Sequence, residues 1–346
     1  MMRLNRQKED PIMKRFIALT LALIVCMAAI PAFADVYEDA GFIKKIPITK
    51  KYRQEAEHKG TVEKITYTCP SYAEQAVSGV EKIVEKDLYV YLPYGYSPDQ
   101  EYNVLYLMHG GGEDERYWLD EERMGAQTCM VLDNMVENGE MEPTIVVAPT
   151  SNLGREPGTE PVYMEENVLV TQAQGGDVPD TLLTQSSSVG FFWQELRYDI
   201  IPMIETRYST FTEGDVSEEN LKATREHRAI AGFSMGSGTT RSVMMHNLDI
   251  IAYFGNYSGG SDGKDFFDAM ASEEFKDLPI KFWYHGEGTD DFALEGHLQF
   301  CASILEKMSD RVTDGVNYAY IELKNGAHAY TCWQVHLYNC LKVFFK

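Results

Sequence analysis

The sequence has few basic residues for its length. Among 346 residues, 31 are Lys or Arg and 53 are Asp or Glu, which gives a formal net charge of −22. A nucleic-acid-binding surface needs clustered Lys and Arg to neutralise phosphates, and an anionic membrane attracts basic segments for the same reason. The charge balance therefore argues against nucleic acid, an anionic membrane or an acidic polymer as a partner, and it favours a neutral substrate.

Motifs typical of metal, nucleotide and redox proteins are also missing. The sequence contains no HExxH, no Walker A loop and no GxGxxG after a strand, so it predicts neither a metal site nor a cofactor. Its six cysteines include no CxxC pair, which gives no support to a zinc ribbon or a thioredoxin-like site. The remaining composition, 44% hydrophobic and 24% charged residues, is that of an ordinary globular protein.

One long apolar run is present, near the start of the chain. A basic segment at residues 13–15 precedes an apolar run at 16–29, and residues 32–34 then supply a small-x-small cleavage pattern. These are the parts of a secretory signal peptide, and the run is shorter than the ~20 residues that a spanning helix needs. We therefore expect residues 1–34 to be removed and the protein to be secreted, extracellular or periplasmic, without a membrane anchor.

Strand-like and helix-like segments alternate along the rest of the chain. Residues 35–60 predict a polar N-terminal arm, and 61–346 predict one catalytic domain. Residues 150–189 break the pattern as an insert, which would serve either as a lid or as a surface decoration. The expected strands are 87–93, 103–108, 144–149, 227–232, 280–285 and 316–323. The expected helices are 128–138, 190–208, 236–247, 294–308 and 330–345. This order predicts an α/β fold with a mostly parallel sheet and helices on both faces.

A serine with glycines two residues to either side follows one of the expected strands. Residues 232–236, Gly-Phe-Ser-Met-Gly, match GxSxG, and a helical segment follows them. A strand–turn–helix setting is typical of the nucleophile elbow of α/β-hydrolases. Glycines leave room for so sharp a turn, and the helix N-terminus favours a developing oxyanion. We therefore expect Ser234 to be the nucleophile; the alternative is a glycine-rich loop that only opens a helix.

A serine hydroxyl needs a base, and in α/β-hydrolases the chain order is Ser, then Asp or Glu, then His. His328 lies in a loop between the last expected strand and the last expected helix, which is the position for a catalytic base. The loop after the preceding strand holds three carboxylates that compete for the role of the orienting acid: Glu287, Asp290 and Asp291. The other histidines after Ser234 lie in or beside expected helices and strands: His246, His285, His297 and His336.

A fourth motif follows the buried strand 103–108. Residues 109–112 read His-Gly-Gly-Gly, and glycines there let the backbone approach a substrate carbonyl. We expect the N–H groups of Gly111 and Met235 to form the oxyanion hole.

These residues resemble a known group of α/β-hydrolases. The segments 91–96 (Tyr-Leu-Pro-Tyr-Gly-Tyr), 104–112 (Val-Leu-Tyr-Leu-Met-His-Gly-Gly-Gly) and 232–237 (Gly-Phe-Ser-Met-Gly-Ser) resemble the esterase family that includes feruloyl esterases, acetylxylan esterases and S-formylglutathione hydrolase. The similarity runs from about residue 60 to the C-terminus and is strongest to bacterial feruloyl esterases of carbohydrate esterase family one. In those enzymes a Gly-Thr-x-Asp segment supplies the acid, and the match at 288–291 implies Asp291 rather than Asp290.

The resemblance implies a serine carboxylesterase that forms an acyl-enzyme on feruloylated or acetylated plant polysaccharide. Trp118 and Trp333 follow the glycine loop and His328, and each is a candidate either for binding a planar acyl group or for the core. Three rival functions are an acetylxylan esterase, a serine peptidase, and a carbohydrate-binding protein on an inactive hydrolase scaffold. The complete serine, acid, histidine and glycine-loop set argues against the last.

Overall fold

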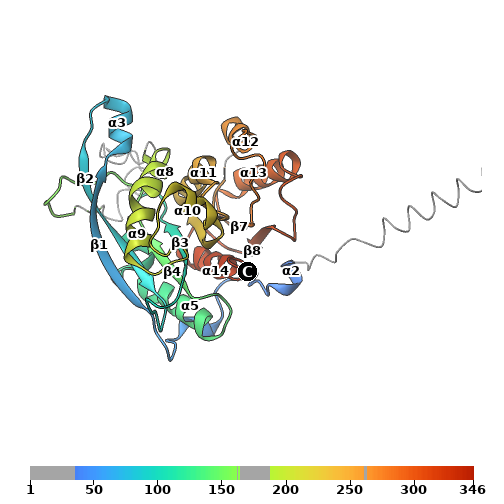
Figure 1. The fold of residues 1–346 in the computed structure, drawn as a ribbon. Coiled ribbons are helices and arrows are strands. Elements are labelled where there is room, and N and C mark those ends of the chain that lie inside the picture. Colours follow the sequence, from blue (N-terminus) through green and yellow to red (C-terminus); the bar gives the residue numbers. More distant parts are fainter. Residues whose placement is uncertain (1–35, 162, 164–187, 261–262) are drawn as a thin grey trace, which may run out of the picture.

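The structure is a computed structural model that describes residues 36–161, 163, 188–260 and 263–346 (Figure 1). The signal peptide expected at residues 1–34 lies outside these ranges, as does most of the expected insert at 150–189. Within the described ranges, none of the helices combines the length and the apolar character needed to cross a bilayer.

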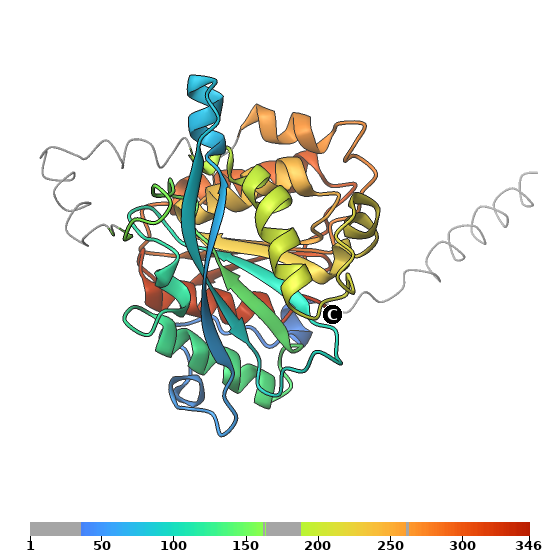
Figure 2. The same cartoon turned by 60° about the vertical axis from the view of Figure 1, so that its left-hand side comes forward.

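One eight-stranded sheet, in the order β1-β2-β4-β3-β5-β6-β7-β8, forms the centre of the molecule. Its strands are β1 (Thr61–Pro70), β2 (Ile83–Leu92), β3 (Asn103–Met108), β4 (Thr144–Ala148), β5 (Arg228–Phe233), β6 (Tyr253–Tyr257), β7 (Phe282–Gly288) and β8 (Tyr318–Leu323). β2 pairs antiparallel with both β1 and β4, and every other neighbouring pair is parallel. Figure 2 shows the long β1–β2 hairpin crossing the front of the molecule. The mostly parallel α/β sheet predicted from the sequence is therefore confirmed.

Helices cover both faces of this sheet. The longer helices are α5 (Gly125–Glu137), α11 (Met235–Asn247), α13 (Leu294–Lys307) and α14 (Tyr330–Leu341). The shorter ones are α2 (Val36–Asp39), η1 (Lys50–Arg53), α3 (Tyr72–Ser78), α4 (Arg116–Leu119), α8 (Phe192–Glu195), η2 (Leu196–Ile200), α9 (Ile201–Arg207), α10 (Glu218–Ala223), η3 (Arg225–His227) and α12 (Lys264–Met270). Because successive side chains of a strand point to opposite faces of the sheet, β3 contributes residues to two separate hydrophobic cores. Val104 and Tyr106 belong to the core that also contains side chains of α8, α9, α11 and α13, whereas Leu105 and Leu107 belong to the core that contains side chains of α4, α5 and α14.

Several elements differ from the sequence predictions. β1 and β6 were not expected, and the helix expected at 190–208 is divided by the π-helical turn η2. The N-terminal arm is not a free extended segment, since its Tyr52 is buried against Tyr338, with 4.7 Å between ring centroids. In both Figure 1 and Figure 2, α2 lies beside the C-terminal end of the chain.

Candidate active site

Ser234 lies on a sharp turn between the end of β5 and the start of α11. Its φ is 54° and its ψ is −118°, a backbone region that non-glycine residues seldom occupy and that is typical of nucleophile elbows. The Ser234 N–H donates a 2.9 Å hydrogen bond to the carbonyl oxygen of Tyr257, the last residue of β6. The neighbouring strand therefore holds the strained turn in place and leaves the half-buried serine at the carboxyl edge of the sheet.

The two glycines of the elbow are required by close packing. A Cβ on Gly232 would lie 2.7 Å from the backbone of Gly236 and from the Cβ of Met108, and a Cβ on Gly236 would lie 2.4 Å from the carbonyl oxygen of His109. A Cβ atom essentially never lies this close to a non-bonded heavy atom, so only glycine fits at either position. The absence of side chains lets α11 approach the end of β3, where the His-Gly-Gly-Gly loop begins.

The structure brings together the two residues expected to form the oxyanion hole. A Cβ on Gly111 would lie 3.8 Å from the Cβ of Met235, which is the first residue of α11. The first N–H groups of a helix have no partner within the helix, so the Met235 N–H is suited to bind an anion. The role of both donors remains a prediction from the sequence, and their proximity is what the structure adds.

His109 anchors the glycine loop. Its Nδ1 lies 2.8 Å from the carbonyl oxygen of Gly110, and its Nε2 lies 2.8 Å from the hydroxyl of Thr150, just after β4. Burial lowers the pKa of His109 to about 4, so this imidazole stays neutral near pH 7. His109 therefore positions the loop without adding charge to the site.

His328 and Asp291 form a direct pair. The Nδ1 of His328 lies 2.8 Å and 2.9 Å from the two carboxylate oxygens of Asp291. The Asp291 side chain is completely buried, while 19% of the His328 side chain is exposed. Burial raises the pKa of Asp291, but hydrogen bonds from His328 and from the Ala293 N–H outweigh it, so the net pKa lies below the usual value. An ionised Asp291 holds the proton of His328 on Nδ1 and leaves Nε2 free to act as a base.

The competing acids lie elsewhere. Asp290 is exposed and accepts a 3.2 Å hydrogen bond from the Thr289 hydroxyl, and Glu287 is buried with its carboxylate 2.9 Å from Nδ1 of His297. The remaining candidate histidines are also engaged away from Asp291. His285, His297 and His336 are fully buried, and His246 stacks on Trp193.

The loops that carry the acid and the base are joined to each other. The Asn325 N–H donates a 2.7 Å hydrogen bond to the hydroxyl of Thr289, and the Asp290 N–H donates a 2.8 Å hydrogen bond to the carbonyl oxygen of Gly326. A Cβ on Gly288 would lie 2.2 Å from that same oxygen. The glycines at 288 and 326 therefore permit close contact between the two loops.

The two tryptophans support the site from within. Trp118 is 1% exposed and donates its indole N–H to the carbonyl oxygen of Met108, 3.0 Å away, so of its two candidate roles, acyl binding and core, the structure favours the core. Trp333 is 7% exposed. Its ring stacks on Phe233 with 3.8 Å between centroids and meets His328 edge-on at 5.1 Å. Trp333 thus lies between His328 and Phe233, the residue that precedes Ser234.

Sequence reasoning missed two residues of the site. Phe292, next to Asp291, is 81% exposed, and its ring centroid lies 4.3 Å from that of His328. Ser258, just after β6, is buried and accepts a 2.8 Å hydrogen bond from the Trp333 indole. A hydrogen bond from its side chain also lowers the pKa of Asp291. An aromatic residue directly after the acid was visible in the sequence, whereas no sequence signal pointed to Ser258.

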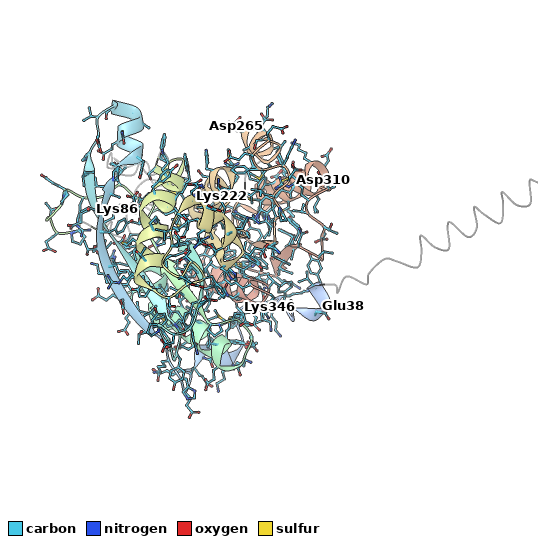
Figure 3. All side chains as sticks on the ribbon, in the orientation of Figure 1. Glu38, Lys86, Lys222, Asp265, Asp310 and Lys346 are labelled. Atoms are coloured by element: carbon cyan, nitrogen blue, oxygen red, sulfur yellow. The ribbon has the colours of Figure 1, made fainter. Side chains whose placement is uncertain are left out.

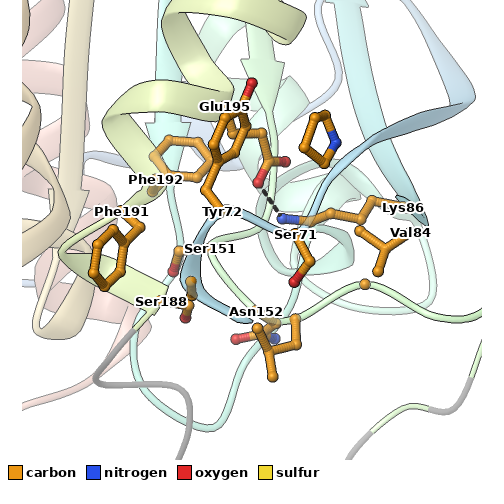
Figure 4. Close-up of a pocket in the computed structure, with 14 residues that line it drawn as sticks. Ser71, Tyr72, Val84, Lys86, Ser151, Asn152, Ser188, Phe191, Phe192 and Glu195 are labelled. Carbon is orange, nitrogen blue, oxygen red and sulfur yellow. Dashed lines mark hydrogen bonds and ion pairs between the residues drawn. The ribbon is translucent and has the colours of Figure 1, made fainter. Parts of the chain in front are cut away.

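Several cavities lie on the β1–β2 side of the molecule, where Figure 3 labels Lys86. The cavity in Figure 4 has a volume of about 20 Å³ and contains the 2.8 Å ion pair between Lys86 and Glu195. Its volume is close to that of one water molecule, and no residue of the predicted triad lines it. A larger cavity of about 540 Å³ is lined by Thr150, Glu115 and further polar residues. Burial and the neighbouring Asp114 raise the pKa of Glu115 to about 7.

Comparison with known proteins finds related esterases. Residues 85–245 match the family model described as "Putative esterase". This segment belongs to the esterase family. Two curated relatives match as well: endo-1,4-beta-xylanase Y of Acetivibrio thermocellus, 34% identical over 70% of the chain, and an endo-1,4-beta-xylanase/feruloyl esterase of Xylanibacter ruminicola, 26% identical over 68% of the chain. The chain spans only 18% and 26% of the lengths of these two relatives.

Solved structures of esterases share the fold. A mutant of the feruloyl esterase module from Clostridium thermocellum, complexed with sinapinate, superimposes with a TM-score of 0.66 at 27% identity, over 88% of this chain and 94% of that one. The ferulic acid esterase of the anaerobic fungus Anaeromyces mucronatus gives a TM-score of 0.58 at 22% identity, over 86% and 96%, a likeness that concerns the fold. The predicted α/β-hydrolase fold and esterase family are thus confirmed, and the comparisons support the expectation of a serine carboxylesterase.

Proposed function

We propose that the protein is a secreted serine esterase that hydrolyses hydroxycinnamoyl esters, such as feruloyl esters, of plant cell-wall arabinoxylan. The observation that carries the proposal is the pairing of His328 with the buried carboxylate of Asp291. Trp333 links this pair to Phe233, the residue before the strained turn of Ser234. Relatives whose names include xylanase and feruloyl esterase support the choice of substrate. The chain's negative charge is compatible with a largely neutral polysaccharide.

In the first half of the proposed reaction, the hydroxyl oxygen of Ser234 attacks the ester carbonyl carbon and its proton passes to Nε2 of His328. The carbonyl oxygen becomes an oxyanion that accepts hydrogen bonds from the N–H groups of Gly111 and Met235. The tetrahedral intermediate then collapses, the bond to the sugar oxygen breaks, and His328 gives its proton to that oxygen. The products are a free sugar hydroxyl and an acyl group on Ser234.

In the second half, water attacks the acyl carbon and its proton passes to His328. Collapse of the second intermediate breaks the bond to Ser234, which regains the proton, and the carboxylic acid leaves. Asp291 keeps its charge throughout, because its function is to fix the tautomer of His328 and to stabilise the imidazolium.

Phe292 supports an aromatic acyl group. A large apolar side chain that is 81% exposed and in ring contact with the catalytic base offers a stacking surface to a planar ring, and aromatic pairs contribute about 0.5–1.5 kcal/mol beyond buried area. An acetyl group is too small to use this surface. The position of Phe292 therefore favours a hydroxycinnamoyl ester over the acetylxylan alternative.

The proposal is tested by assaying the purified protein and Ser234→Ala on methyl ferulate, acetylated xylan and a peptide. We expect the wild type to hydrolyse methyl ferulate fastest and the variant to lose at least about 10³-fold in kcat. Preferential release of acetate would replace the feruloyl assignment, and equal inactivity of both proteins on all three substrates would refute the esterase. Secretion is tested separately by N-terminal sequencing of exported protein, which should begin at Asp35.

A further inference from the structure

A second group of reactive side chains lies behind the acid loop, buried in the fold. His285 is on β7, and His297 and Cys301 are one turn apart on α13. Their exposed fractions are 0%, 0% and 5%, and one potential ligand atom from each lies within 4.8 Å of those of the other two. Neither the proposed hydrolysis nor the family match assigns this group a role.

The hydrogen bonds of the group set the protonation of His297. Its Nδ1 lies 2.9 Å from a carboxylate oxygen of the fully buried Glu287, and its Nε2 lies 2.9 Å from Nδ1 of His285. When Glu287 is ionised it accepts the Nδ1 proton of His297, which leaves a lone pair on Nε2 that faces the centre of the group. Histidines that bind metals commonly donate their second N–H to a carboxylate in this way.

One polar atom of the group has no partner. Within the described part of the chain, Nε2 of His285 is buried and makes no hydrogen bond, and its ring is surrounded by Trp283, Phe300 and Tyr318, with ring centroids 4.8–6.0 Å away. Buried polar atoms without a partner are uncommon in native proteins. An ion bound at Nδ1 of His285 would keep the proton on Nε2, so the case for an ion rests on the approach of the two imidazoles and the thiol to one another. A hydrogen-bonded chain from Glu287 through His297 to His285 therefore accounts for only part of this polar cluster.

We propose that His285, His297 and Cys301 bind a zinc ion, with Glu287 orienting His297 from outside the coordination shell. Two imidazole nitrogens and one thiolate suit zinc better than a hard cation such as calcium or magnesium. In a tetrahedral zinc site with bonds of about 2.0–2.3 Å, ligand atoms lie roughly 3.3–3.7 Å apart. The two nitrogens at 2.9 Å would separate slightly and the more distant atoms would move inward.

The position of the site suggests a structural role. β7 ends at Gly288 and α13 begins at Leu294, and the loop between them carries Asp291. A zinc ion between His285 and α13 would join the strand and the helix at the base of this loop. Zinc binding would then add to the free energy of unfolding, without contact with the reacting atoms at Ser234.

The test uses the whole protein, unfolded in denaturant and refolded either with zinc or with EDTA, because a buried site exchanges metal slowly. We expect one zinc ion per chain by elemental analysis after dialysis, and a Tm at least about 5 °C higher with zinc than with EDTA. Refolding with cobalt(II) should give a thiolate-to-cobalt charge-transfer band.

Cys301→Ala and His297→Gln should lose the zinc and the cobalt band. Cys69→Ala, at another buried cysteine on β1, should keep both and is the matched control. Refolded wild type with no stoichiometric zinc and with the same Tm in zinc and EDTA would overturn the proposal and leave a metal-free hydrogen-bond chain. Zinc retained equally by Cys301→Ala and His297→Gln would also overturn it. Because the readouts are metal content and stability, neither result depends on whether the esterase proposal holds.

Discussion

The indole N–H of Trp333 donates a 2.8 Å hydrogen bond to the hydroxyl of Ser258. A hydrogen bond from the same hydroxyl lowers the pKa of Asp291, and the Trp333 ring meets the His328 ring edge-on. Trp333 therefore contacts His328 directly and Asp291 through Ser258. We expect it to position this pair.

We expect Trp333→Phe, which keeps a ring but removes the indole N–H, to lower kcat about 5-fold. One lost hydrogen bond corresponds to about 1 kcal/mol, and 1.36 kcal/mol corresponds to a tenfold rate. Ser258→Ala should lower kcat by at least as much, because it removes the group that acts on Asp291. KM for methyl ferulate should not change in either variant. A lower Tm with unchanged kcat would show that Trp333 only packs the core.

Asp291→Asn should lower kcat by about 10³–10⁴-fold, because an amide in place of the carboxylate favours the wrong tautomer of His328. Asp290→Asn is the matched control, one residue away but exposed, and it should change kcat less than twofold. Both are measured with methyl ferulate at saturating concentration. The reverse order of losses would transfer the acid role to Asp290.

Phe292→Ala should raise KM for methyl ferulate about 3–10-fold, the equivalent of losing one aromatic contact. The same substitution should leave hydrolysis of a small acetyl ester nearly unchanged, since an acetyl group does not reach the ring. Phe292→Tyr preserves the ring and should restore KM. A parallel loss on both substrates would mean that Phe292 supports His328 and does not bind the acyl group.

Two glycines of α11 should respond oppositely to alanine. Gly236→Ala places a Cβ 2.4 Å from the carbonyl oxygen of His109, whereas Gly238→Ala places one 3.9 Å from the nearest atom, on Val189. We expect Gly236→Ala to lower the free energy of unfolding by more than about 2 kcal/mol, as overpacked cores do. Gly238→Ala should change it little or raise it by up to about 1 kcal/mol through helix propensity. Urea unfolding measures both, and similar values would contradict the close contact at Gly236.

Glu115 gives a pH dependence of stability. Its pKa is raised to about 7 by burial and by Asp114, against about 4.3 in an unfolded chain. Between these values the folded protein keeps a proton that the unfolded chain has lost, so the free energy of unfolding falls as the pH rises through 7. Glu115→Gln has no proton to lose at this position, so its free energy of unfolding does not fall in this way. Its Tm should exceed that of the wild type at about pH 8 but not at about pH 4. Glu121→Gln, at an exposed position, is the control, and an equal rise at both pH values would refute the effect.

The parts of the site that the sequence predicted are those with strict local requirements. Gly232 and Gly236 flank Ser234 because no other residue fits there, so the elbow is visible as a five-residue pattern. The strands β3, β4 and β5 are buried on both faces and appear as continuous apolar runs. The domain boundaries expected near residues 34 and 60 remain predictions.

The parts that were missed depend on contacts between distant segments. β6 contains Gly255 and Asn256, which interrupt its apolar run, and Asn256 is accepted in the core because it hydrogen-bonds to Ser237 and Trp283. Trp118 is near the glycine loop in sequence, but its indole N–H turns inward to a strand carbonyl. Such pairings follow from the packing of helices on the sheet, which a residue pattern does not encode.

The hydrogen bonds between the two loops at residues 288–291 and 325–328 have a mechanical consequence. Because Thr289 and Asp290 are hydrogen-bonded to Asn325 and Gly326, the loop of Asp291 and the loop of His328 are held together as one rigid unit. Thermal bending of the sheet would move His328 and Asp291 together and leave the distance between them almost constant. Thermal fluctuations would then change mainly the distance between these two joined loops and the turn of Ser234. On heating, we expect the rate of attack on the ester to fall before Asp291 and His328 separate.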